Sequence, residues 1–294
     1  GWEFRVDAVP FENRDWRVGF YFNIAHNENK ITEMPDNYTE ENYTFNNGEY
    51  AYRREEGRPM GSFYGYRYKG VCQNKDATYA RDADGNVMKD ISGNAIVMRN
   101  GTATIAPGDA LYEDINHDGV INQYDIVYLG NSNPRFTGGA GVNVSYKQFK
   151  LSAIFYGRYG QDVVNSTRLN NESMRGIDNQ STAVLRRWRN EGDQTDIPRA
   201  LYGEGYNTLG SDRFVEDASY LRLKSLSFNY RLPKKIIQRW GFSNIDVYVT
   251  GYNLFTWTKY TGQDPEVKTE NTYARDSATT PASIQLVAGF NLSF

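Results

Sequence analysis

The chain has 294 residues, a formal net charge of −3 and a mean hydropathy of −0.70. This charge gives no electrostatic reason to expect nucleic acid as a partner, and no apolar run reaches the ~18 residues of a membrane-spanning helix. Two histidines, His26 and His117, supply a histidine-dependent catalytic or metal site poorly, and the single Cys72 excludes an intrachain disulfide. Aromatic residues make up 15% of the chain, which together with the low hydropathy indicates extended strands with one wet face.

Seven segments alternate apolar and polar side chains with a period of two, the pattern of half-buried strands. In the second segment, Phe20 and Phe22 share one face and Tyr21 lies on the other. In the fifth segment the parity changes, which predicts a β-bulge near Lys224–Ser225. The predicted strands lie near residues 1–11, 15–28, 134–146, 149–160, 214–231, 244–257 and 284–294.

The connections alternate between short and long. Long ones are expected near 29–133, 161–213 and 258–283, whereas the fifth and sixth strands are joined by a short helix with Pro233 as its first helical residue (N1) and Gly241 near its end. This alternation is typical of an outer-membrane barrel with long extracellular loops. The sequence therefore predicts an all-β fold, a transmembrane antiparallel up-and-down β-barrel that seven strands leave incomplete. A soluble β-sandwich is the alternative, but its loops are usually short at both ends.

The stretch "DINHDGVINQYD" has the spacing of a calcium-binding loop. Carboxylate or amide oxygens recur at positions 1, 3, 5, 9 and 12, a carbonyl falls at position 7, and Gly119 occupies the sharp turn at position 6. Neither flank is helical, so the loop is an insert and not an EF-hand, and a turn without an ion remains the alternative. The predicted ligands of a structural Ca²⁺ are Asp114, Asn116, Asp118, Val120 (through its carbonyl), Asn122 and Asp125.

Several motifs together resemble one known family. They are "GSFYGYRYKGV" (61–71), the segment 108–146 around the acidic loop, "RFVEDASYLRLKSLSFNYRLP" (213–233), "VYVTGYNLFTWTKYTGQDPEV" (247–267) and the terminal "GFNLSF". In this order they resemble the C-terminal part of SusC/RagA-type TonB-dependent transporters of Bacteroidota, over nearly the whole chain.

The resemblance implies an outer-membrane barrel of 22 strands, of which these would be the last seven. The plug and the earlier strands would lie outside the 294 residues, as would the contacts with TonB. It also implies a SusD-like surface lipoprotein as partner, import of oligosaccharides or oligopeptides, and an extracellular position for the acidic loop. The terminal Phe294 resembles the signal read by the outer-membrane assembly machinery.

Other polar and aromatic groups have two interpretations each. The residues of the aromatic motif would either bind a substrate by stacking and hydrogen bonding or pack within the loops, and packing is favoured. They are Tyr64, Tyr66, Arg67 and Tyr68. A short helix capped by Ser181 and ending near Gly192 would carry three arginines that bind an anion or the lipoprotein, or that are simply solvated. Lumen-facing charges would line a substrate path or only the wall: Arg5, Arg17, Lys150, Arg158 and Asp246.

The sequence thus favours a transporter section, bounded by lipid and by the remainder of its barrel, over two alternatives. One is a soluble calcium-dependent carbohydrate-binding β module, and the other is a passive structural barrel or adhesin. No His, Cys or Ser constellation supports an enzyme.

Overall fold

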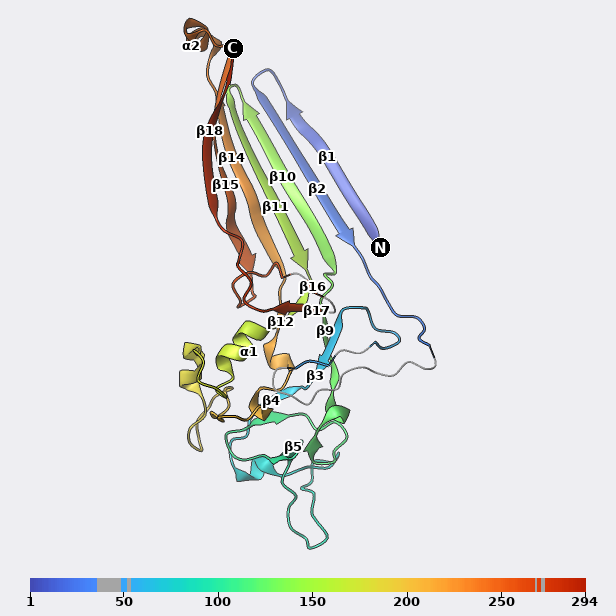
Figure 1. The fold of residues 1–294 in the computed structure, drawn as a ribbon. Coiled ribbons are helices and arrows are strands. Elements are labelled where there is room, and N and C mark those ends of the chain that lie inside the picture. Colours follow the sequence, from blue (N-terminus) through green and yellow to red (C-terminus); the bar gives the residue numbers. More distant parts are fainter. Residues whose placement is uncertain (36–48, 52–53, 268, 271–272) are drawn as a thin grey trace.

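The computed structural model describes residues 1–35, 49–51, 54–267, 269–270 and 273–294. Its main element is a seven-stranded antiparallel sheet in the order β1-β2-β10-β11-β14-β15-β18. Figure 1 shows the sheet at one end of the molecule, with β1 and β18 at its two open edges. The strands are β1 (Trp2–Glu12), β2 (Trp16–His26), β10 (Phe136–Tyr146), β11 (Phe149–Tyr159), β14 (Tyr220–Arg231), β15 (Asn244–Thr258) and β18 (Gln285–Ser293).

This sheet confirms the all-β antiparallel fold class. The predicted bulge is present, because the registers of β14 shift between Leu223 and Ser225 against β15 and between Ile154 and Phe155 of β11. One strand boundary differs from the prediction by more than two residues. Residues 214–219 do not continue the fifth strand, since Val215–Asp217 (β13) pairs with Asp162–Asn165 (β12) in a separate sheet.

One face of the large sheet is apolar and exposed. A single cross-strand row on this face contains Phe4, Ile24, Gly138, Gly157, Leu221 and Trp257. Phe4 is 52% exposed and Trp257 53% exposed, so nothing in the described chain covers them. We call this the outer face; the polar side chains of the same strands lie on the inner face.

The strands are joined in two ways. At one end, Lys147 turns with φ 51° between β10 and β11, and a short helical connection joins β14 to β15. That connection consists of α2 (Lys234–Ile237) and the 3-10 turn η6 (Gln238–Trp240), and it ends at Gly241 with φ 80°. Pro233 is the N-cap and not, as expected, the first helical residue. Among the described residues, no helix has the length and apolar content needed to cross a membrane.

At the other end, the described residues of the three long connections fold together into what we call the loop assembly, which lies within 27–135, 160–219 and 259–284 (Figure 1). Its strands are β3 (Ser62–Gly65), β4 (Tyr68–Val71), β5 (Arg99–Asn100), β6 (Ala103–Thr104), β7 (Ala110–Tyr112), β8 (Val120–Ile121), β9 (Val127–Asn131), β12, β13, β16 (Thr269–Glu270) and β17 (Tyr273–Asp276). Its helical elements are α1 (Ser166–Glu172), η1 (Lys75–Thr78), η2 (Gln123–Asp125), η3 (Thr182–Arg186), η4 (Tyr206–Thr208) and η5 (Asp212–Phe214).

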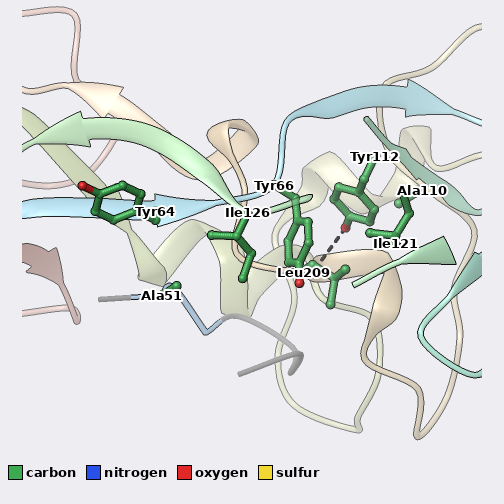
Figure 2. Close-up of a cluster of buried hydrophobic side chains, with 8 residues drawn as sticks. All are labelled: Ala51, Tyr64, Tyr66, Ala110, Tyr112, Ile121, Ile126 and Leu209. Atoms are coloured by element: carbon green, nitrogen blue, oxygen red, sulfur yellow. Dashed lines mark hydrogen bonds between the residues drawn. The ribbon is translucent and has the colours of Figure 1, made fainter. Parts of the chain in front are cut away.

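The loop assembly has apolar cores of its own. The largest combines eight side chains from segments far apart in sequence, from Ala51 to Leu209 (Figure 2). A second core centres on Phe63 and Phe214, both 0% exposed. The described parts of the long connections are therefore well packed, and they hold most of the buried apolar residues that the structure describes.

Candidate functional site

The Asp114–Asp125 loop has the tight backbone that its sequence predicts. His117 and Gly119 adopt positive φ angles of 57° and 81°. Asp114 accepts hydrogen bonds from the backbone N–H groups of Asp118 (3.3 Å) and Gly119 (2.8 Å). Asn116 also accepts from the Asp118 N–H, at 3.2 Å. The oxygens at positions 1 and 3 of the loop therefore converge on one backbone group.

Asp125 closes the loop from its far end. One oxygen accepts from the Ile115 N–H and the other from the Asn122 N–H, both at 2.8 Å. The side chain is 0% exposed. Burial raises the pKa of Asp125 above its usual range, and the carboxylates of Asp114 and Asp118 raise it further. The loop thus concentrates negative charge around a buried carboxyl.

The donor set of this loop fits a hard cation only in part. It offers oxygen atoms alone, as Ca²⁺ prefers, and a carboxylate oxygen that accepts one N–H retains a second lone pair. The described residues, however, contain no group of three or more His, Cys, Asp or Glu side chains placed to hold a metal. Asn122 is also engaged, since its amide accepts from the Tyr124 N–H and donates to the Val120 carbonyl. Asp114, Asn116 and Asp118 fit best.

The aromatic motif lies beside this loop, mostly inside the protein. Tyr64 and Tyr66 are 0% and 1% exposed and belong to the core shown in Figure 2. Tyr68 is held by hydrogen bonds from its N–H to Asp212 and from its hydroxyl to the Asp196 carbonyl. Burial raises the pKa of Tyr66 and Tyr68, and Tyr64 is fully enclosed. This burial favours packing over stacking on a substrate.

Arg67 is the accessible member of this motif. Its side chain is 53% exposed and donates to Glu113 at 3.0 Å. Lys69 approaches the same carboxylate at 3.4 Å. Glu113 and Lys69 line a hollow of about 590 Å³ that also includes Asp114 and His117 of the acidic loop. The accessible polar groups of the motif and the loop therefore lie close together.

A buried ion network that the sequence did not reveal ties the loop assembly to the sheet. Arg222 of β14, 2% exposed, donates to Glu266 at 2.7 Å, to Thr256 at 2.8 Å and to Asp264. Lys224 reaches Glu266 at 2.8 Å. Both acids belong to the segment "GQDPEV". The sequence signal for this network was a pair of basic residues two apart on a strand, Arg222 and Lys224, followed by a pair of acids two apart in the next loop.

A second network holds two of the long connections together. Arg168 of α1 bridges Glu172 and Glu216, each at 3.1 Å, and Arg213 donates to Glu172 at 2.9 Å. Burial alone would raise the pKa of Glu216, but hydrogen bonds from Thr261 and Arg168 lower it below its usual range. The network joins segments on both sides of β14, so it fixes how these loops stand over the end of the sheet.

Comparisons with known proteins agree with this architecture. The chain is 32% identical to "TonB-dependent receptor P3" of Formosa agariphila over 92% of its length, which is 25% of that relative. It is 25% identical to "TonB-dependent receptor SusC" of Bacteroides thetaiotaomicron over 100% of its length and 26% of that relative. A solved structure described as the RagAB peptide transporter superposes with a TM-score of 0.69 and 26% identity, over 99% of this chain and 29% of that one. No family model matches the sequence.

The chain belongs to the SusC/RagA-type TonB-dependent receptors. The resemblance stated from its motifs is thereby confirmed. It spans between 25% and 30% of the length of the curated relatives that it matches. The activity and the partners of a whole receptor are accordingly treated below as proposals.

The remaining predicted positions in this receptor section are placed as follows. Arg5 pairs with Asp7 on the same strand at 2.7 Å, Arg17 lies 3.5 Å from Glu12, and Asp246 accepts from Arg231 at 2.9 Å. These inner-face charges thus have neighbours of opposite sign, which suits a barrel wall. Arg158 donates to the Tyr156 hydroxyl at 3.3 Å, and Lys150 is exposed.

The predicted helix at 181–192 is shorter than expected. Ser181 caps it as expected by accepting from the Ala183 N–H, but the helix is a 3-10 turn that ends at Arg186. Arg187 and Arg189 lie beyond it and donate to the carbonyls of Val184 and Leu185. These two arginines therefore help to terminate the turn.

Cys72 and Phe294 have contrasting environments. Cys72 is buried, donates to the Asn74 carbonyl at 3.3 Å, and has a pKa raised to about 11 by burial. Phe294 follows β18, is 90% exposed, and lies with its ring centroid 5.0 Å from that of Phe242. The terminal ring is therefore largely exposed, with one face near Phe242.

Proposed function

We propose that the chain forms the C-terminal part of a TonB-dependent outer-membrane transporter, supplying seven wall strands and three extracellular loops. One observation carries the proposal. The large sheet has two open edges, β1 and β18, and an uncovered apolar outer face. Open edges are not tolerated in a membrane, so they require further strands, and an apolar outward band is the face that a membrane barrel turns to lipid.

The proposed transport cycle involves no covalent chemistry in this chain. A plug supplied by the rest of the receptor would move under force from TonB and release an oligosaccharide or oligopeptide captured beneath a SusD-like lipoprotein. The loop assembly, held over the end of the sheet by Arg222 and Glu266, would provide the surface under that lid. The similarity to the RagAB peptide transporter supports a peptide cargo. We propose that Arg67 is the residue of the aromatic motif that contacts it.

The test is purification of this polypeptide from detergent-solubilised outer membranes, followed by mass spectrometry of the proteins that accompany it. We expect a plug-bearing polypeptide or segment and a surface lipoprotein. Recovery in the soluble fraction without either would overturn the proposal. It would favour the soluble carbohydrate-binding module instead.

We also propose that Ca²⁺ binds Asp114, Asn116 and Asp118, with Val120, Asn122 and Asp125 completing the site. The support is the oxygen-only donor set and the raised pKa of Asp125, which burial raises first and repulsion from the carboxylates of Asp114 and Asp118 raises further. A bound cation would relieve this repulsion and would order the loop at the same time.

Hydrogen exchange of the purified receptor, with calcium and with chelator, tests the site. We expect calcium to slow exchange in residues 114–125 and Asp118→Ala to abolish that effect. Asp90→Ala is the matched control, because Asp90 closes a similar Asx turn through the N–H groups of Ser92 and Asn94. Equal exchange with and without calcium in the unmodified receptor would contradict the site.

A further inference from the structure

A row of aromatic rings marks the outer face of the sheet at the end where the strands have short connections. Trp16 of β2, Tyr146 of β10, Phe149 of β11 and Tyr230 of β14 lie opposite one another in register. The ring centroids of Trp16 and Tyr146 are 4.3 Å apart, and those of Phe149 and Tyr230 are 4.6 Å apart. Trp and Tyr rings gather where a membrane meets water. On the proposed function, this row therefore marks the edge of the membrane on the periplasmic side, where barrel connections are short.

The helical connection between β14 and β15 begins just beyond this row and carries an apolar ridge. Figure 1 shows α2 projecting from the end of the sheet, beside the C-terminus. Ile236 and Trp240 are four residues apart, which places them on one side of a helical turn, and they are 45% and 61% exposed. Ile237, in contrast, is 1% exposed. The connection thus buries one isoleucine, whereas the described chain leaves its neighbour and a tryptophan uncovered.

The apolar ridge joins the outer face of the sheet at Phe294. The Phe242 ring, which follows the connection, has its centroid 5.0 Å from that of Phe294. Phe294 is 90% exposed, and Leu292, two residues earlier, is 41% exposed. The backbone holds this arrangement, because the Ser243 N–H donates to the Ser293 carbonyl at 2.8 Å. A continuous apolar surface therefore leads from the outer face to the connection.

A row of cations runs beside the apolar ridge. Lys235 and Arg239 are also four residues apart, and each directly precedes a member of the ridge. Together with Lys234 they are exposed, and residues 232–245 contain no acid. The connection therefore presents a single sign of charge next to its apolar strip.

The acids at this end of the sheet already have partners. The segments that form this end, residues 12–17, 146–149, 231–246 and 290–294, contain three acids. Each of them lies close to a cation outside the helical connection: Glu12 to Arg17 at 3.5 Å, Asp15 to Lys147 at 3.9 Å and Asp246 to Arg231 at 2.9 Å. The cations of the connection are consequently available to an anionic surface beyond the described chain.

An exposed apolar strip beside a row of cations is the pattern of a helix that lies in a membrane surface. Because the ridge continues the lipid-facing surface, a membrane fits it better than an acidic protein in water. Resting on the proposed function, which places this end at the periplasmic edge of the membrane, we propose that the connection binds anionic phospholipid of the periplasmic leaflet. Ile236 and Trp240 enter the acyl region, and Lys234, Lys235 and Arg239 contact the phosphates.

Native mass spectrometry of the complete receptor, purified from outer membranes in mild detergent and titrated separately with phosphatidylglycerol and phosphatidylcholine, tests the proposal. The test variant combines Lys234→Gln, Lys235→Gln and Arg239→Gln. The matched control removes the same charge from three exposed cations of the loop assembly: Lys75→Gln, Lys89→Gln and Arg99→Gln. A charge-retaining variant separates charge from side-chain shape: Lys234→Arg, Lys235→Arg and Arg239→Lys.

We expect the unmodified receptor to retain phosphatidylglycerol more strongly than phosphatidylcholine. The test variant should weaken retention of phosphatidylglycerol by at least about tenfold, because each basic side chain near an anionic surface contributes about fivefold. The loop control and the charge-retaining variant should retain this lipid as the unmodified receptor does. Ile236→Ser combined with Trp240→Ser should weaken retention of both lipids.

Equal retention of phosphatidylglycerol by the test variant and the unmodified receptor would overturn the proposal. So would a test variant that keeps the lipid but loses a co-purifying acidic protein, which would assign the cations to that partner. Heat-modifiable migration in electrophoresis, which a folded membrane barrel shows, checks that each variant folds. Its absence from the unmodified receptor would be a failure of the proposed function itself.

Discussion

The large sheet and the loop assembly place their apolar side chains in opposite ways. On the sheet, Val249 and Phe290 are 48% and 67% exposed, and they belong to a continuous apolar face. In the loop assembly, Phe63 and Tyr64 are both 0% exposed and are enclosed in cores. The difference follows from the solvent that each region is built for. On the proposed function, lipid covers the apolar face of the sheet, whereas the loops stand in water and must bury their apolar side chains.

The largest expected effect comes from opening a core of the loop assembly. Phe63→Ala leaves a cavity among Tyr50, Phe214 and Leu169 and should destabilise the loops by about 3–5 kcal/mol. Hydrogen exchange of the purified receptor should rise in residues 61–71 and 127–132. Heat-modifiable migration of the barrel should persist. Loss of heat-modifiable migration in this variant would show that the sheet and the loop assembly unfold together, against the prediction.

The next largest effect is expected when a charged side chain is placed on the apolar outer face of the sheet. Val249→Arg should cost about 2–4 kcal/mol if its face meets the membrane midplane, measured as a lower urea midpoint for unfolding in lipid vesicles. The control is Ile177→Arg, since Ile177 is an apolar loop residue that is 92% exposed and should tolerate the charge. Equal tolerance at both positions would remove the argument for lipid.

The sequence predicted the sheet more completely than the loop assembly. Alternation in segments such as Phe20–Tyr21–Phe22 is a local signal, because side chains on a strand point alternately to two faces. The sheet and even the bulge near Lys224–Ser225 followed from it. The acidic loop was likewise visible, since its hydrogen bonds join residues within one short segment.

The loop assembly was not predictable in the same way. Its cores join Ala51, Tyr112 and Leu209, and its ion pairs join Arg222 to Glu266. These contacts depend on the way in which the three long connections fold back on one another. No periodic pattern of apolar residues in the sequence encodes that folding. The aromatic motif shows the limit: its tyrosines could be recognised, but the burial that favours packing became visible only in three dimensions.

A smaller effect measures one hydrogen bond inside the loop core. The Tyr112 hydroxyl accepts from the Leu209 N–H at 3.0 Å, and both groups are buried (Figure 2). Tyr112→Phe leaves that N–H without its acceptor and should cost about 1–3 kcal/mol, seen as faster exchange at residues 207–211. Tyr124→Phe, at a ring 69% exposed, should change nothing. A neutral Tyr112→Phe would mean that another acceptor replaces the hydroxyl.

The smallest effect is a pH dependence confined to the loops. Hydrogen bonds from Thr261 and Arg168 lower the pKa of Glu216, overcoming the opposing effect of burial. A carboxyl whose pKa is lower in the folded state contributes stability that is fully present above its unfolded pKa, about 4.3, and that is lost as pH falls through the folded value. Exchange in residues 161–172 and 212–217 should therefore accelerate below about pH 4, while protection in the apolar strand β18 stays constant. Glu216→Gln, which keeps the size of the side chain but does not titrate, should remove this pH dependence. An unchanged profile would contradict its assignment to the Glu216 carboxyl, which pairs with Arg168.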